Sequence, residues 1–141
     1  MDEVQLSRLI KRCKKLKFKF KGVFAADNFP PLARNTFQIV NASEASSIGT
    51  HWTLICNRSN LIIFADPLGL NLNFYRKIYK RILSLYDKVN EILANNPIQP
   101  SNSDECGLYC IYIVHCVFSN IFPKVPLISQ SALHRFVKHM Q

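Results

Sequence analysis

A cysteine stands at the predicted start of an apolar helix, where its thiol could act as a nucleophile. Residues 106–119 (CGLYCIYIVHCVFS) are almost wholly apolar and too long for one strand, which predicts a buried central helix. The unpaired N–H groups and the positive dipole at the start of a helix would lower the pKa of Cys106 and receive a developing oxyanion. Gly107 would let a substrate carbonyl approach the backbone, and Ser103 or Asp104 could cap the helix. A small buried cysteine without reactivity is the alternative.

A histidine and an aspartate lie at the ends of two predicted strands that would place them side by side. Residues 51–56 and 61–66 are typical strands around the turn 57–60, which predicts an antiparallel hairpin. A register that sets His51 opposite Asp66 fits this turn. His51 would then take the thiol proton, and Asp66 would fix the tautomer of the imidazole. Each residue alone is also common, as a surface-loop histidine or as a turn carboxylate before proline.

Gln99 lies seven residues before Cys106 in a polar, proline-bearing stretch (95–105) that is expected to form a loop. Its amide could complete an oxyanion hole, as side-chain amides do in acyl-transfer enzymes. A loop amide that only faces solvent is the alternative. Cysteines and one histidine are also grouped in residues 106–116, but neither C-x-x-C nor H-E-x-x-H spacing occurs, so no metal site is expected.

The order of these residues resembles the adenovirus protease (adenain) family, within the larger superfamily that includes the SUMO-specific proteases. The matching stretches are VNASEASSIGTHW, IIFADPLG and IQPSNSDECGLYCIYIVHCVF, and an upstream F-x-G-x-F element extends the resemblance to nearly the whole chain. The resemblance implies a cysteine endopeptidase with Cys106 as nucleophile and His51 as general base and acid. It assigns Asp66 to orient His51, and Gln99 to the oxyanion hole together with the backbone N–H of Cys106.

The resemblance also has implications for substrates and activators. Family substrates carry small glycine residues beside the scissile bond, which implies a narrow cleft with Trp52, Gly49 and Gly107 as substrate contacts. The chemistry, peptide-bond hydrolysis through a thioester, requires no cofactor. The adenovirus enzyme uses DNA, and an activating viral peptide is disulfide-linked to a cysteine between its acidic residue and its nucleophile. Residues 57–105 here contain no cysteine, so an activating peptide is expected to bind without a covalent link.

The leading interpretation is a maturation protease of an adenovirus-like virus or a virus-like mobile element, which processes capsid precursors. Its expected locations are the host cell nucleus or cytoplasm and the virion. A deconjugase that removes ubiquitin-like proteins would have the same active site, and a basic nucleic-acid-binding module would keep only the fold. The closer motif match and the lack of extra domains favour the maturation protease.

Helices at both ends and strands in the middle predict an α+β fold. The expected fold is a small mixed or antiparallel sheet packed against the buried helix that carries Cys106 at its N-terminus. The alternation of KFKFK at 17–21 predicts a short strand with Phe18 and Phe20 on one face. The other expected elements are an amphipathic helix over 4–16, a strand at 36–42, a long amphipathic helix over 74–93 and a short helix near 129–140.

Length and composition narrow the class of protein. The 141 residues correspond to about one domain, so we expect a single protease domain over 1–141. The content of 48% hydrophobic and 19% charged residues argues against disorder. No apolar run reaches the roughly 18–20 residues of a membrane span, and no signal peptide is visible. Five cysteines, an odd number, indicate free thiols in a reducing compartment.

The charge of +9 is concentrated near the N-terminus, where residues 1–22 carry eight basic and two acidic side chains. Such a cluster favours a polyanion partner, and DNA fits the family resemblance. A solvated basic helix face is the alternative. The candidate nucleic-acid contacts are Arg8, Lys11, Arg12, Lys14, Lys15, Lys17 and Lys19.

Overall fold

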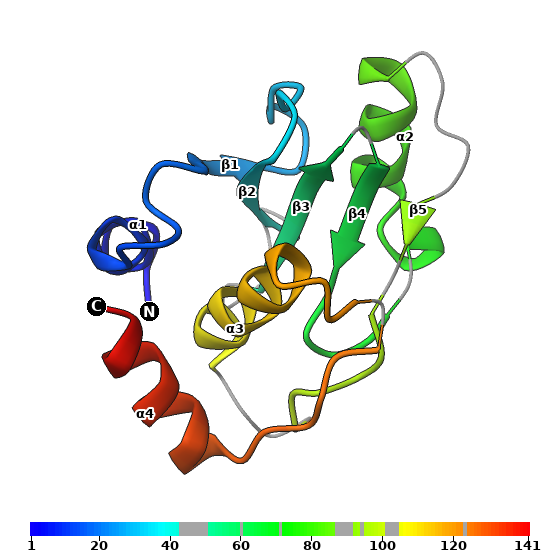
Figure 1. Ribbon diagram of the computed structural model, residues 1–141. Coiled ribbons are helices and arrows are strands. Elements are labelled where there is room, and N and C mark those ends of the chain that lie inside the picture. The colour runs from blue at the N-terminus through cyan, green and yellow to red at the C-terminus, as the bar shows by residue number, and fades with distance from the viewer. Residues whose placement is uncertain are drawn as a thin grey trace.

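A five-stranded mixed sheet forms the centre of the computed structural model, which describes residues 1–42, 51–59, 61–70, 72–86, 92–93, 95–100, 105–122 and 124–141. The strands lie in chain order (Figure 1). The inner pairs β2–β3 and β3–β4 are antiparallel, and the outer pairs β1–β2 and β4–β5 are parallel. Their bounds are β1 (Phe20–Ala25), β2 (Thr36–Asn41), β3 (Trp52–Arg58), β4 (Leu61–Ala65) and β5 (Ile92–Leu93).

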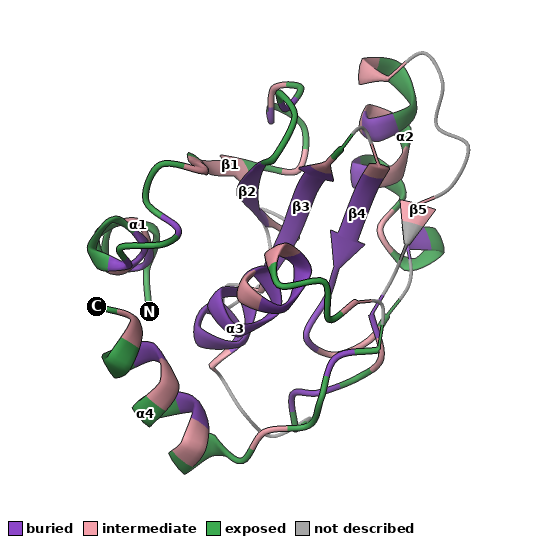
Figure 2. Ribbon diagram, viewed as in Figure 1, coloured by how far each residue is buried: buried purple, intermediate pink, exposed green. Residues whose placement is uncertain are grey.

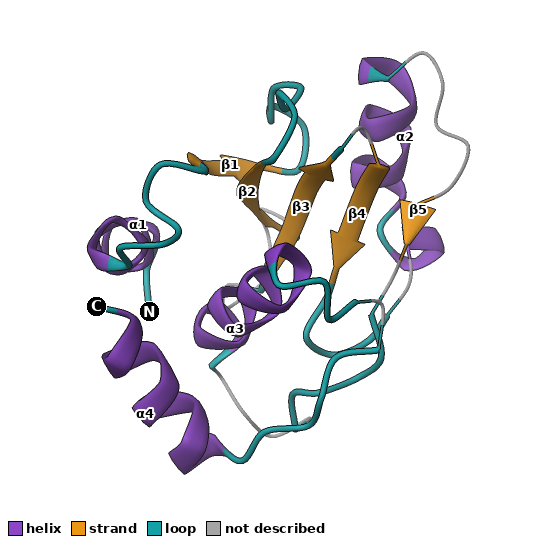
Figure 3. Cartoon of the chain, viewed as in Figure 1, coloured by secondary structure: helices purple, strands orange, loops and turns teal. Residues whose placement is uncertain are grey.

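Helices cover both faces of this sheet, because successive strand residues point to opposite faces and both sets are apolar. Ile39 and Leu54 belong to one core with side chains of α1 (Glu3–Arg12), α3 (Cys106–Phe118) and α4 (Gln130–Met140). Their neighbours Val40 and Ile55 belong to a second core with α2 (Arg76–Leu85), which follows a short 3-10 turn at Leu72–Phe74. Figure 3 shows α3 in front of the lower end of β3. The α+β fold predicted from the sequence is confirmed.

Helix α3 is the most deeply buried of the helices in the described chain. All of its residues are buried except His115 and Phe118, which are half-buried, and Figure 2 shows it almost entirely in the colour of buried residues. It packs on the central strand β3 and on α4. The helix predicted from the apolar run at 106–119 is therefore confirmed, and its first residue is Cys106.

The strand predicted at 17–21 is wrong for its first three residues. Residues 14–19 form turns, in which the N–H groups of Lys17 and Lys19 donate to the carbonyls of Cys13 and Leu16. These local bonds satisfy the backbone without a strand partner, and Phe18 is left 82% exposed. The strand β1 begins only at Phe20.

The long helix predicted over 74–93 is also wrong at both ends. Helix α2 begins at Arg76 and ends at Leu85, where the extended backbone of Tyr86 caps it. Residues 92 and 93 pair with residues 62 and 63 of β4 instead, and residues 87–91 lie outside the described part. The apolar side chains at 92–93 fit the helical period, but the free edge of β4 offers them backbone hydrogen bonds.

The predicted hairpin of β3 and β4 is confirmed, with a register two residues from the expected one. Leu54 lies opposite Ala65, whereas a pairing of His51 with Asp66 would set residue 52 opposite residue 65. A shift of two keeps every side chain on the same face of the sheet.

No helix of the described chain combines the length and the apolar character of a membrane span.

The loop after β4 is joined to a second loop, residues 95–100. The N–H groups of Ile98 and Gln99 both donate to the carbonyl of Pro67, at 3.0 and 2.9 Å. Gly69 permits this approach, because a Cβ at that position would lie only 2.7 Å from backbone atoms of Pro97. The φ of Gly69, +79°, is also one that side-chain-bearing residues rarely adopt.

Candidate active site

The carboxylate of Asp66, immediately after β4, is fully buried and held by hydrogen bonds on both oxygens. Its Oδ1 lies 2.7 Å from Nε2 of His51 and accepts the N–H of Leu68 at 3.0 Å, while its Oδ2 accepts the hydroxyl of Tyr75 at 2.7 Å. Asn95 binds the backbone on either side, since Oδ1 accepts the N–H of Asp66 and Nδ2 donates to its carbonyl. A buried charge needs such partners, and they fix the orientation of the carboxylate.

His51 joins this carboxylate to the thiol of Cys106. Because Nε2 faces Asp66, the second ring nitrogen is the one available for its hydrogen bond with the Cys106 side chain. The backbone N–H of Trp52 also donates to Sγ of Cys106, at 3.4 Å. The structure thus brings together three residues that are 15 and 40 positions apart in the sequence, from the start of β3, the end of β4 and the start of α3.

These contacts shift both pKa values in the direction of an ion pair. Burial disfavours the charged imidazole, but Asp66 and Cys106 outweigh it and raise the pKa of His51 to about 9. Burial likewise disfavours the thiolate, but His51 and the N–H groups of Trp52 and Gly107 outweigh it and lower the pKa of Cys106. Between these two pKa values the pair is an imidazolium and a thiolate, which is the nucleophilic form of cysteine.

Gln99 is buried in the loop 95–100, and its backbone is anchored to Pro67, the residue after Asp66. The predicted part of its side chain in an oxyanion hole stays a prediction. The residue before Cys106 is Glu105, at the N-cap position of α3, and it makes no capping hydrogen bond through its side chain. The predicted caps Ser103 and Asp104 lie outside the described residues.

Of the three predicted substrate contacts, the structure describes the surroundings of Trp52 and Gly107. Trp52 is 4% exposed, and its indole N–H donates to the carbonyl of Met1. A Cβ at Gly107 would lie 3.2 to 3.5 Å from atoms of Leu6, Met1 and Trp52, so this glycine serves the packing of α1 on α3. Contact of either residue with a substrate stays a prediction, and Gly49 lies outside the described residues.

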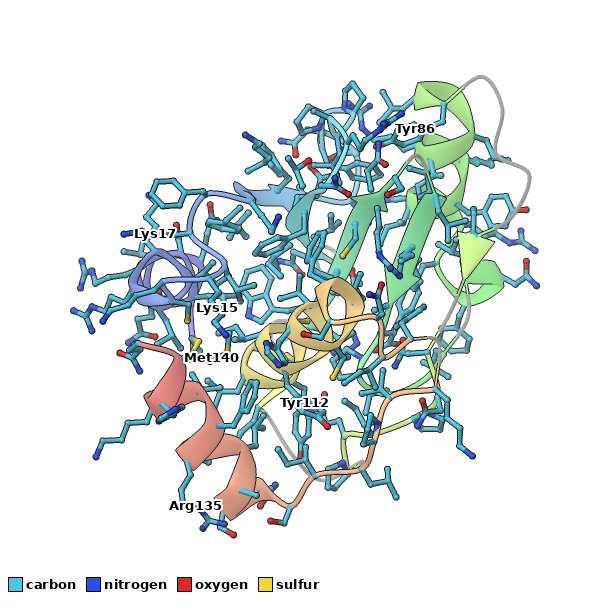
Figure 4. The ribbon with its side chains drawn as sticks, in the orientation of Figure 1. Lys15, Lys17, Tyr86, Tyr112, Arg135 and Met140 are labelled. Atoms are coloured by element: carbon cyan, nitrogen blue, oxygen red, sulfur yellow. The ribbon has the colours of Figure 1, made fainter. Side chains whose placement is uncertain are left out.

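The basic N-terminal residues lie at the surface beside α4. Arg8, Lys11, Arg12, Lys14, Lys15 and Lys17 are exposed, whereas Lys19 is half-buried with its Nζ 5.0 Å from the centre of the Phe118 ring. The N–H of Lys14 donates to the carbonyl of Met140, which joins this segment to the end of α4. Figure 4 labels Lys15 and Lys17 next to α1, with Arg135 on α4.

Within the described ranges, no three acidic, cysteine or histidine side chains are grouped as metal ligands.

Two site residues were missed from the sequence, Tyr75 and Asn95. The ring of Tyr75 stacks on His51 with centroids 6.3 Å apart, and its hydroxyl holds Asp66. The sequence pattern places Tyr75 in a helix and Asn95 in a polar loop. A buried carboxylate requires donors, and Asn95 offered a signal because it lies in the stretch that also carries Gln99.

We expect iodoacetamide near neutral pH to modify Cys106 faster than Cys56 or Cys116, since burial raises the pKa of the latter two thiols. His51→Ala removes the cation that stabilises the thiolate, so the onset of Cys106 alkylation should move to higher pH. Peptide mass spectrometry after timed alkylation between about pH 5 and pH 10 gives the three rates. Equal rates for the three thiols would contradict an activated Cys106.

Tyr75→Phe should lower the free energy of unfolding by about 1–3 kcal/mol, because it leaves a buried carboxylate oxygen without its donor. Urea denaturation measures this loss. Tyr79→Phe is the matched control, since Tyr79 also lies near the start of α2 and its hydroxyl bonds to none of the described residues. Equal stability of the two variants would show that the hydroxyl of Tyr75 does not hold Asp66.

The chain is similar in sequence to a protease of bovine adenovirus 7, with 26% identity over 99 residues. That alignment covers 60% of this chain and 49% of the relative, so the chain matches about half the length of the curated protein. No family model matches the chain.

Two solved structures share the fold. A crystal structure of the ASFV protease has a TM-score of 0.51 and 13% identity, over 93% of this chain and 66% of the other. A structure of an AvrA deletion variant with IP6 and CoA has a TM-score of 0.52 and 12% identity, over 84% of this chain and 51% of the other. The sequence match supports the resemblance to the adenovirus protease family, and the chain shares the fold of these two solved structures.

Proposed function

We propose that the chain is a cysteine protease that hydrolyses peptide bonds. The observation that carries this proposal is the buried hydrogen-bonded series Asp66, His51, Cys106 at the start of α3, in which the pKa of the imidazole is raised and that of the thiol is lowered. The match to an adenovirus protease supports the same reaction class.

The proposed reaction has two halves, acylation of Cys106 and hydrolysis of the resulting thioester. Sγ of Cys106 attacks the scissile carbonyl carbon, and the oxyanion is received by the N–H of Cys106 with the amide of Gln99. His51 then gives its proton to the leaving amine as the C–N bond breaks and a thioester forms. In the second half His51 takes a proton from water, whose oxygen attacks the thioester, and the C–S bond breaks so that Sγ leaves as a thiolate beside the imidazolium. Asp66 keeps the imidazole oriented throughout.

The proposed substrates are capsid precursors of an adenovirus-like virus or virus-like element, cleaved beside glycine. This part rests on the family resemblance, as do the virion and the infected cell as locations. A deconjugase of ubiquitin-like proteins would use the same groups, and cleavage of a ubiquitin-like fusion in preference to capsid precursors would favour it.

Cys106→Ala should abolish cleavage of a glycine-containing precursor peptide, because it removes the attacking sulfur. The control is Cys116→Ala, which removes a thiol near the other end of α3 and should retain turnover. Liquid chromatography of the products, with precursor peptides and a ubiquitin-like fusion offered in parallel, measures both. Turnover by the Cys106→Ala variant would reject the proposed nucleophile.

The exposed basic residues of the N-terminal segment are proposed to bind DNA. Binding to phosphates releases counterions, so the affinity should fall steeply with added salt. Lys14→Ala with Lys17→Ala should reduce the slope of log affinity against log salt by about 2, whereas Lys80→Ala with Lys124→Ala, exposed side chains elsewhere, should not. Fluorescence anisotropy of labelled DNA measures the slopes. An affinity without salt dependence would dismiss this partner.

A further inference from the structure

A pocket of about 490 Å³ lies on the side of His51 away from the core of α3. It is formed where β1 and β2 end and α2 begins, by residues 25–27, 41–42 and 74–78. Its volume falls within the range of ~300–1,000 Å³ that is usual for ligand sites. Neither the core nor the proposed chemistry uses this space.

Two residues join the pocket directly to His51. Tyr75 lines the pocket, stacks its ring at 6.3 Å from the imidazole and donates its hydroxyl to Asp66. Ala42 lines it as well, and its N–H donates to the carbonyl of His51 at 2.8 Å. Tyr75 and Ala42 therefore each contact His51 and line the pocket.

The positions of Cys106 and His51 determine on which side of the site each half of a substrate lies. The acyl part of a substrate stays on the sulfur, whereas the leaving amine must lie within hydrogen-bond reach of the imidazole that protonates it. The chain that follows the scissile bond consequently leaves on the His51 side. A pocket that borders His51 on its far side is in position for the residues just after that bond.

The lining of the pocket favours one kind of peptide. Three alanines leave room, and Tyr75 with Phe74, whose side chain is 71% exposed, offers aromatic surface. Arg76 and Lys77 are exposed, and neither is in an ion pair with a described residue, while Asp27 is the one acidic residue among the described residues of the lining. The two cations exceed the single acid, so a carboxylate is attracted on balance.

We propose that this pocket binds the leaving-group side of the substrate and selects a large apolar side chain with an acidic residue beside it. The inference rests on the proposed protease function, since it takes the substrate to be a peptide whose scissile bond lies at Cys106. It adds Phe74, Arg76 and Lys77 as residues that determine specificity.

The test measures binding without turnover, on the full chain carrying Cys106→Ala. Labelled peptides with glycine before the scissile bond would carry Leu-Asp, Leu-Lys or Gly-Gly after it, and fluorescence anisotropy would give each affinity. We expect Leu-Asp to bind roughly three- to tenfold more tightly than Leu-Lys, as two exposed cations allow. Gly-Gly should bind more weakly than Leu-Asp because it fills no apolar space.

Charge variants locate the effect. Arg76→Glu and Lys77→Glu should each reduce the preference for Leu-Asp, and Asp27→Asn should increase it. Lys80→Glu is the matched control, because Lys80 lies on the same helix, is exposed and does not line the pocket. Equal binding of Leu-Asp and Leu-Lys, or an equal loss with Lys80→Glu, would overturn the proposal. Displacement by inorganic phosphate or a nucleotide with no discrimination among the peptides would also overturn it.

The outcome is separable from that of the proposed function. A preference for Leu-Asp in binding, with no cleavage by the unmodified chain, would support the proposed peptide pocket and reject the proposed protease function. Cleavage that is abolished by Cys106→Ala but indifferent to the residues after the scissile bond would leave the protease and reject the pocket.

Discussion

The buried carboxylate of Asp66 is the constraint on which the rest of the site depends. A charge without access to water is costly unless hydrogen bonds and an opposite charge offset it. Here the two oxygens are hydrogen-bonded to His51, Tyr75 and the N–H of Leu68, and Asn95 is hydrogen-bonded to the backbone of Asp66. The same negative charge raises the pKa of His51, which in turn lowers that of Cys106.

Much of this arrangement could be predicted from local patterns. The apolar run after Cys106 and the two turn-linked strands were sufficient for a buried helix and a hairpin, because both signals are contained in short segments. The errors arose where distant partners decide the structure. Ile92 and Leu93 fit the helical period, yet the edge of β4 takes them into a strand. Phe18 fits a strand, yet local hydrogen bonds keep its backbone in a turn.

The site residues follow the same division. His51, Asp66 and Cys106 could be singled out because their types and order carry the chemistry. Tyr75 could not, since its importance comes from a hydrogen bond and a ring contact that only the folded chain brings about. The packing of Leu6 and Trp52 beside Gly107 likewise appears only in the folded chain, and contact of Gly107 with a substrate stays a prediction. Sequence patterns thus predicted the reactive groups better than their surroundings.

The bonds from Ile98 and Gln99 to Pro67 make two loops into one unit, and Gly69 allows the close fit. Trp52 makes a similar unit of β3 and α3, because its backbone contacts the sulfur of both Cys106 and Cys110. One of these units carries the carboxylate and Gln99, the other carries the imidazole and the sulfur, and the paired strands β3 and β4 hold the two together.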